Sequence, residues 1–147
     1  MNDFAIITTD LKKTYAHGKD AVKGVNLKVP KGSVYVFLGR NGAGKTTFLK
    51  LASGLLTPDL GSVTRGGDAV YCEQKTDRPP EGIGDIFSAY GSPGFEAVPL
   101  LGIEEEWARR WDTLSHGERK KLQIAKALSL DPDILARNGF PWAQSTA

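Results

Sequence analysis

A short glycine-rich loop constrains this chain more than any other stretch. Residues 39–47 read GRNGAGKTT, and they directly follow the apolar run 34–38, VYVFL. Glycines let the backbone turn tightly and place its N–H groups against an anion, and the N-terminus of a following helix adds partial positive charge. A strand, the pattern GxxxxGKT and a helix together form a phosphate-binding loop, so the sequence predicts a bound nucleotide.

The loop residues have different expected roles. The residues expected to contact the nucleotide are Gly39, Arg40, Asn41, Gly42, Ala43, Gly44, Lys45, Thr46 and Thr47. Lys45 is expected to reach the β- and γ-phosphates, the Thr46 hydroxyl to ligate Mg²⁺, and Thr47 to bond a phosphate oxygen. The alternative is a glycine-rich turn with a surface lysine, which does not account for the strand before it and the helix after it.

The composition narrows the class of protein. The chain has 147 residues, of which 40% are hydrophobic and 24% charged, as is typical of one globular domain. A net charge of +2 gives no indication of nucleic-acid or membrane binding. The single cysteine, Cys72, excludes an internal disulfide and is expected to be a small buried residue. We see neither a membrane span nor a signal peptide, and we therefore expect a cytoplasmic location.

Hydrophobic periodicity predicts the main elements. Strands are expected at 4–9, 21–29, 33–38, 62–64 and 69–73, and helices at 45–52, 83–90, 103–110 and 118–130. The run 33–38 is apolar on both faces, which is typical of a central, doubly covered strand. In the last helix Leu122, Ile124, Ala125 and Leu128 are the expected apolar stripe, with Arg119, Lys120 and Lys126 facing water.

A second motif narrows the class of nucleotide-binding protein. The stretch 114–128, LSHGERKKLQIAKAL, resembles the signature motif LSGGQ of the ATP-binding cassette (ABC) ATPases, with His116 and Glu118 as departures. Ser115 and the backbone at Gly117 open a helix whose N-terminus suits a γ-phosphate. The resemblance implies that Ser115, Gly117 and Glu118 contact a nucleotide bound on an opposing cassette. The alternative, a surface helix capped by Ser115 and Glu118, leaves the phosphate-binding loop unexplained.

Two further site residues rest on the resemblance alone. Tyr15 resembles the aromatic residue that stacks on adenine, and its alternative is an ordinary strand tyrosine. Gln74, which ends AVYCEQ, resembles the glutamine that contacts Mg²⁺ and the attacking water, and its alternative is a polar strand-end residue. The resemblance thus implies ATP and Mg²⁺ as cofactors, with Thr46 and Gln74 as metal ligands.

The resemblance also implies the fold and the domain organisation. The expected fold is α/β, a P-loop NTPase of the ABC type with a mixed β-sheet around the phosphate-loop helix and a small helical subdomain. We expect a partial ATP-binding domain at 1–135, a compact helical subdomain within it at 76–130, and a tail at 136–147 that matches nothing in the family.

The resemblance stops before the family's catalytic acids. In this family an aliphatic strand ends in Asp-Glu, which holds Mg²⁺ through water and polarises the attacking water. Here no Asp or Glu follows Asp133. We therefore expect a cassette that is incomplete at its C-terminus, with an exposed apolar edge at 34–38. A truncation or a frame change in the coding sequence is one hypothesis for this pattern.

The sequence leaves the branch and the activity open. The first half resembles transporter cassettes, and the second half resembles ABC-F proteins, which act on ribosomes. A second cassette is the expected partner, together with a membrane permease or a ribosome. The chain is interpreted as a cassette that binds ATP; hydrolysis is the activity of the family, and the missing acid pair argues against it in this chain. The three competing possibilities are an ATPase cassette, a nucleotide-binding remnant without turnover and a non-folding product. Measurements of nucleotide binding and then of phosphate release distinguish these three possibilities.

Overall fold

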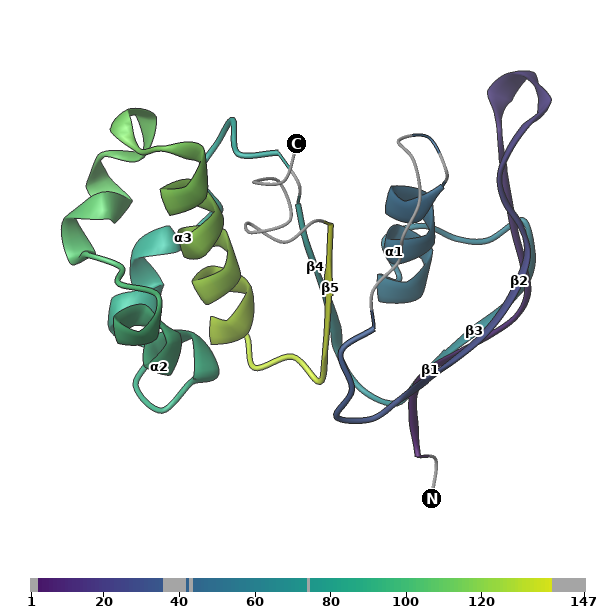
Figure 1. Cartoon of the computed structure of the whole chain (residues 1–147), viewed down its shortest axis with the longest axis horizontal. Coiled ribbons are helices and arrows are strands. Elements are labelled where there is room, and N and C mark those ends of the chain that lie inside the picture. Colours follow the sequence, from purple (N-terminus) through teal and green to yellow (C-terminus); the bar gives the residue numbers. More distant parts are fainter. Residues whose placement is uncertain (1–2, 36–41, 43, 74, 139–147) are drawn as a thin grey trace. The chain divides into compact units, whose positions relative to one another are not determined.

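The computed structural model describes residues 3–35, 42, 44–73 and 75–138, and these form two compact units (Figure 1). Unit 1 comprises Met1–Tyr71 with Asp133–Ala136, and unit 2 comprises Cys72–Pro132 with Arg137–Ala147. Among the helices described, none has the length and apolar character needed to span a lipid bilayer.

Unit 1 is built on a three-stranded antiparallel sheet. Its strands are β1 (Phe4–Tyr15), β2 (Lys19–Pro30) and β3 (Leu60–Arg65), in the order β2-β1-β3. The strand predicted at 4–9 is confirmed but continues past Asp10 through a register irregularity between Thr8 and Leu11. Asp10 adopts a φ of +46°, and its N–H donates to the Asn26 side chain, so a bulge replaces the expected strand end.

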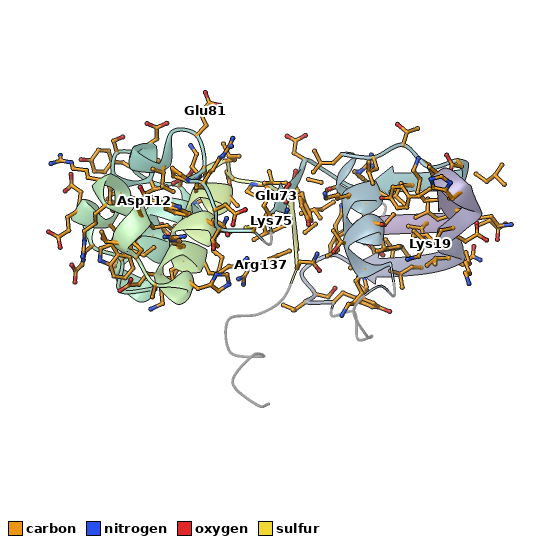
Figure 2. The ribbon with its side chains drawn as sticks, turned by 90° about the horizontal axis from the view of Figure 1, so that it is seen from above. Lys19, Glu73, Lys75, Glu81, Asp112 and Arg137 are labelled. Atoms are coloured by element: carbon orange, nitrogen blue, oxygen red, sulfur yellow. The ribbon has the colours of Figure 1, made fainter. Side chains whose placement is uncertain are left out.

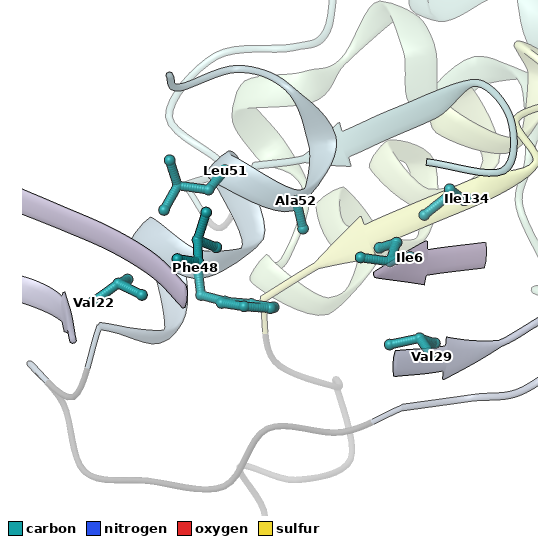
Figure 3. Packing of buried hydrophobic residues seen from close by; sticks show 8 residues of the cluster. Ile6, Val22, Val29, Phe48, Leu51, Ala52 and Ile134 are labelled. Atoms are coloured by element: carbon teal, nitrogen blue, oxygen red, sulfur yellow. The ribbon is translucent and has the colours of Figure 1, made fainter. Parts of the chain in front are cut away.

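Helix α1 (Lys45–Ser53) supplies the core of unit 1. The helix predicted at 45–52 is confirmed, and Phe48, Leu51 and Ala52 on one side of it are buried with sheet residues such as Ile6 (Figure 3). Arg65 of β3 holds the end of the helix, because its guanidinium donates to the Ala52 carbonyl (2.6 Å) and the Leu51 carbonyl (2.8 Å). The sheet and the helix that follows the phosphate loop are therefore joined by both apolar packing and hydrogen bonds.

Two further strands form a separate pair, β4 (Ala69–Cys72) with β5 (Ile134–Arg137). Ile134 belongs to the buried cluster of unit 1. The central strand predicted at 33–38 is wrong for residues 33–35, which carry no strand. Val34 is 83% exposed there, because no described strand covers it. Residues 36–38 lie outside the described part of the chain.

Unit 2 is helical. It contains α2 (Pro93–Leu100), α3 (His116–Ser129) and short 3-10 helices at Ile83–Phe87, Glu105–Arg109 and Trp111–Thr113. Its core includes Ile86, Leu122 and Ala125, each fully buried, with Trp107 and Trp111 beside them. The helices predicted at 83–90 and 103–110 exist only as the 3-10 turns Ile83–Phe87 and Glu105–Arg109. The second turn ends because the backbone at Arg110 leaves the helical region (φ −126°, ψ 40°).

Lys120 on α3 corrects the predicted amphipathic pattern. The sequence places it on the water-facing side, but it is only 5% exposed, and its ammonium donates to the Glu73 carbonyl (3.4 Å). Gln123, one turn further along, is equally buried and donates to the Lys75 carbonyl (2.6 Å). Helix α3 is thus covered on a second, polar face by the segment around 73–76, which hydrophobic periodicity cannot reveal.

Candidate functional site

The first turn of α1 fits an anion. Gly44 precedes the helix in the left-handed conformation (φ +86°), with no side-chain cap and no acidic residue in the first turn. A Cβ atom at Gly44 would collide with the Ala21 carbonyl oxygen, so Gly44 lies directly against strand β2. The N-terminus of a helix carries partial positive charge, so this helix start suits a phosphate group.

Most of the predicted phosphate contacts surround this turn. Lys45 and Thr46 open α1, and the Thr46 hydroxyl lies on an exposed residue, as an oxygen ligand to a hydrated Mg²⁺ needs to be. Gly42 also has a positive φ and open space where a side chain would begin. The remaining predicted contacts, Gly39, Arg40, Asn41 and Ala43, and the predicted metal ligand Gln74 lie outside the described residues.

The predicted adenine-stacking residue lies beside the same helix. The Tyr15 hydroxyl is 3.1 Å from the Thr47 hydroxyl, while the Tyr15 side chain is 45% exposed. If Tyr15 donates, the Thr47 O–H proton stays available for a phosphate oxygen, because a hydroxyl accepts and donates at once. The structure therefore brings Tyr15 and helix α1 together, with Tyr15 partly exposed to solvent.

The predicted signature residues form the start of α3 in unit 2. Ser115 caps the helix by accepting from the Glu118 N–H (3.2 Å), and the Glu118 carboxylate accepts from the Ser115 N–H (2.7 Å). Ser115 and Gly117 are exposed, and a Cβ at Gly117 would meet nothing within 4 Å. The Ser115 hydroxyl acts as an acceptor in the cap, so its proton is available to donate to a phosphate.

The capping hydrogen bonds also change the acidity of Glu118. The hydrogen bond from the Ser115 backbone N–H lowers the pKa of this carboxyl below its usual value. An ionised Glu118 accepts that bond more strongly than a protonated one. The capping box and an accessible signature turn are therefore compatible features of one segment.

We expect the contribution of Glu118 to stability to depend on pH. Because its folded pKa is lowered, the carboxylate stabilises the fold above the unfolded value of about 4.3, and this effect is lost as the pH falls through the folded pKa. Urea unfolding, monitored by tryptophan fluorescence, measures the free energy of unfolding of the wild type and of Glu118→Gln at each pH. The two chains should differ near neutrality and converge in acid; an equal difference at every pH would contradict the role of the charge.

Sequence analysis missed a polar face of α3 that contacts the segment next to position 74. His116, Arg119, Lys120 and Gln123 have the spacing i, i+3, i+4 and i+7, which places them on one side of a helix. That spacing was visible in the sequence, but their partners were not, because these are backbone carbonyls and one hydroxyl far away along the chain.

The one cysteine lies beside this face. Cys72 is buried, as the sequence predicts, and burial raises the pKa of its thiol. Burial also lowers the pKa of the Lys120 ammonium, with the nearby Arg137 charge acting in the same direction. A buried thiol with a raised pKa carries little thiolate near neutral pH, so we assign Cys72 a packing role.

The comparisons with known proteins agree with this geometry. A family model described as ABC transporter matches residues 22–136, which is most of the chain. The chain belongs to the ABC transporter ATPase family. The sequence-based prediction of an ABC-type P-loop cassette is therefore confirmed.

Individual relatives support the assignment. The chain is 31% identical over 139 residues to the ribose import ATP-binding protein RbsA 1 of Burkholderia thailandensis, covering 94% of this chain and 26% of that protein. It is 34% identical over 133 residues to the molybdenum import ATP-binding protein ModC of a Shewanella species, covering 76% of this chain and 37% of that protein. The chain thus spans well under half the length of these relatives.

Solved structures show the same fold. A dimeric ATP-binding cassette in a post-hydrolysis state, bound to ADP and Pi, superposes with a TM-score of 0.77 at 22% sequence identity. The match covers 96% of this chain and 76% of that one. At this identity the likeness establishes the fold of the ABC cassette.

Proposed function

We propose that this chain binds MgATP as the nucleotide-binding component of an ABC transporter. The observation that carries the proposal is the start of α1 directly behind Gly44, whose left-handed backbone places Lys45, Thr46 and Thr47 in the first turn. The relatives named as import ATP-binding proteins support a transporter, and hence a membrane permease, over a ribosomal partner. A cytoplasmic position next to that permease follows from the proposal.

The residues of unit 1 would divide the recognition of ATP between them. Backbone N–H groups of the α1 turn hold phosphate oxygens, Lys45 neutralises their charge, and Tyr15 offers a partly exposed ring to adenine. Thr46 and Gln74 would hold Mg²⁺, which would offset the negative charge of the phosphates.

The residues of unit 2 would act on a second nucleotide. Ser115 and Gly117 present an exposed helix N-terminus, and the solved cassette bound to ADP and Pi is described as dimeric. We propose that two cassettes meet through this turn, so that Ser115 of each donates to the γ-phosphate held by the other. The Glu118 carboxylate fixes the Ser115 backbone for that contact.

Calorimetric titration of the purified chain with ATP in the presence of Mg²⁺ tests the proposal. Saturable binding that disappears when Mg²⁺ is removed and when Lys45 is changed to alanine is the expected result. A chain that is folded by circular dichroism but does not bind MgATP would refute the assignment.

A further inference from the structure

Side-chain hydrogen bonds join α3 to residues 73, 75 and 76 of unit 2. The Arg119 guanidinium and the Trp111 indole both donate to the Thr76 carbonyl, at 3.0 and 3.2 Å. The Thr76 hydroxyl is 2.9 Å from Nδ1 of His116. Lys120 and Gln123 bond the carbonyls of Glu73 and Lys75, the two residues labelled in Figure 2 that flank position 74.

Thr76 is the central residue of this network. It is 6% exposed, so its carbonyl and hydroxyl need partners inside the protein, and all the partners described come from residues 111–119. Arg119 is equally well fixed, because it also donates to the carbonyls of Trp111 (3.1 Å) and Asp112 (3.1 Å). A planar guanidinium bonded to three carbonyls leaves its neighbours little freedom to move separately.

His116 places this network next to the signature serine. It follows Ser115 directly as the first residue of α3, so any displacement of the capped turn moves the imidazole that bonds Thr76. Thr76, the other partner in this hydrogen bond, lies two residues after position 74. The two motifs, far apart in sequence, are thus separated by one side-chain hydrogen bond and its supporting carbonyl contacts.

We propose that His116 and Arg119 are positioning residues that make the Ser115 turn and the segment 75–76 move as one piece. This inference rests on the proposed function, in which Ser115 contacts a nucleotide on a second cassette. Binding at Ser115 is then transmitted to the backbone beside position 74, the position assigned to Mg²⁺ and the attacking water. His116 stands where the family motif LSGGQ has its first glycine, and the proposal gives this histidine a positioning role.

Amide hydrogen exchange of the whole chain, without nucleotide, tests the connection. Thr76→Val removes the hydroxyl and keeps the volume, and exchange in peptides covering 75–78 should rise about fivefold, the equivalent of one lost neutral hydrogen bond. Thr113→Val is the matched control, because the Thr113 hydroxyl bonds only the nearby Arg110 carbonyl in the described structure. Equal changes in the two variants at 75–78 would overturn the proposal.

The same measurement with MgATP tests the transmission. In the wild type, MgATP should slow exchange both at 115–118 and at 75–78. In His116→Ala the slowing should persist at 115–118 and fall about fivefold at 75–78, and His116→Asn should restore it, because its amide can bond Thr76. Undiminished slowing at 75–78 in His116→Ala would refute the positioning role.

Failure of the proposed function gives a different result. A wild-type chain in which MgATP changes exchange neither in α1 nor at 115–118 would overturn the nucleotide function and the transmission with it. The contrast between Thr76→Val and Thr113→Val without nucleotide would then still decide whether α3 and the segment 75–76 move together.

Discussion

Replacing Lys45 with alanine is expected to weaken ATP binding about 100-fold or more, because it deletes charge-assisted bonds to two phosphates, each contributing about 1.5–3 kcal/mol. The α1 backbone that forms the rest of the anion site stays in place. Tyr15→Ala removes a stacking surface and the bond to Thr47, and should weaken binding only about tenfold. Calorimetric titration with MgATP provides both values.

The comparison between these two variants decides which contact dominates. Both chains should keep the circular dichroism spectrum of the wild type, since Lys45 opens a helix and Tyr15 lies at the exposed end of β1. Equal losses of affinity would mean that adenine stacking, and not the phosphate site, dominates recognition.

Phosphate release by the 147-residue chain with MgATP is expected to stay near background. Losing one acid–base group typically lowers a rate by about 10²–10⁴, and no Asp or Glu follows Asp133 to supply one in this chain. Glu118 is a poor substitute, because the Ser115 N–H lowers its pKa and occupies its carboxylate. Asp133 is also engaged, since it accepts from the Asp68 N–H at 2.9 Å.

A steady-state phosphate assay on the purified chain checks this expectation, with Lys45→Ala as the control for contaminating ATPases. Robust Mg²⁺-dependent release that Lys45→Ala abolishes would contradict it. Asp131, Asp133 or another group would then have to complete the site.

Local signals explain what the sequence could predict. Gly44 and Gly54 bracket α1, and Ser115 with Glu118 marks the start of α3, so both helices follow from residues adjacent in the chain. The phosphate-binding loop and the signature motif could be recognised for the same reason, because each is a continuous stretch. The positions of Lys45, Thr46 and Ser115 at helix starts agree with those predictions.

What the sequence could not predict depends on contacts distant in the chain. Asp10 reads as a strand end, but Asn26 of the neighbouring strand holds it in a bulge. The sequence predicts Lys120 to be a surface residue, but its side chain is buried and donates a hydrogen bond to the Glu73 carbonyl. Neither partner can be identified from periodicity, because a helix or strand pattern reports only which side is apolar.

The two described glycines of the phosphate loop have unequal freedom to vary. Gly42 and Gly44 share the same φ of +86°, so their φ angles do not distinguish them. At Gly42 the space beyond Cα is open, so a side chain there meets only the strain of the left-handed backbone, which Asn and Asp tolerate best. At Gly44 the Ala21 carbonyl occupies that space, so even alanine displaces strand β2 or the loop. A saturation library scored for folded chains would accept Asn or Asp beside glycine at position 42, and glycine alone at position 44.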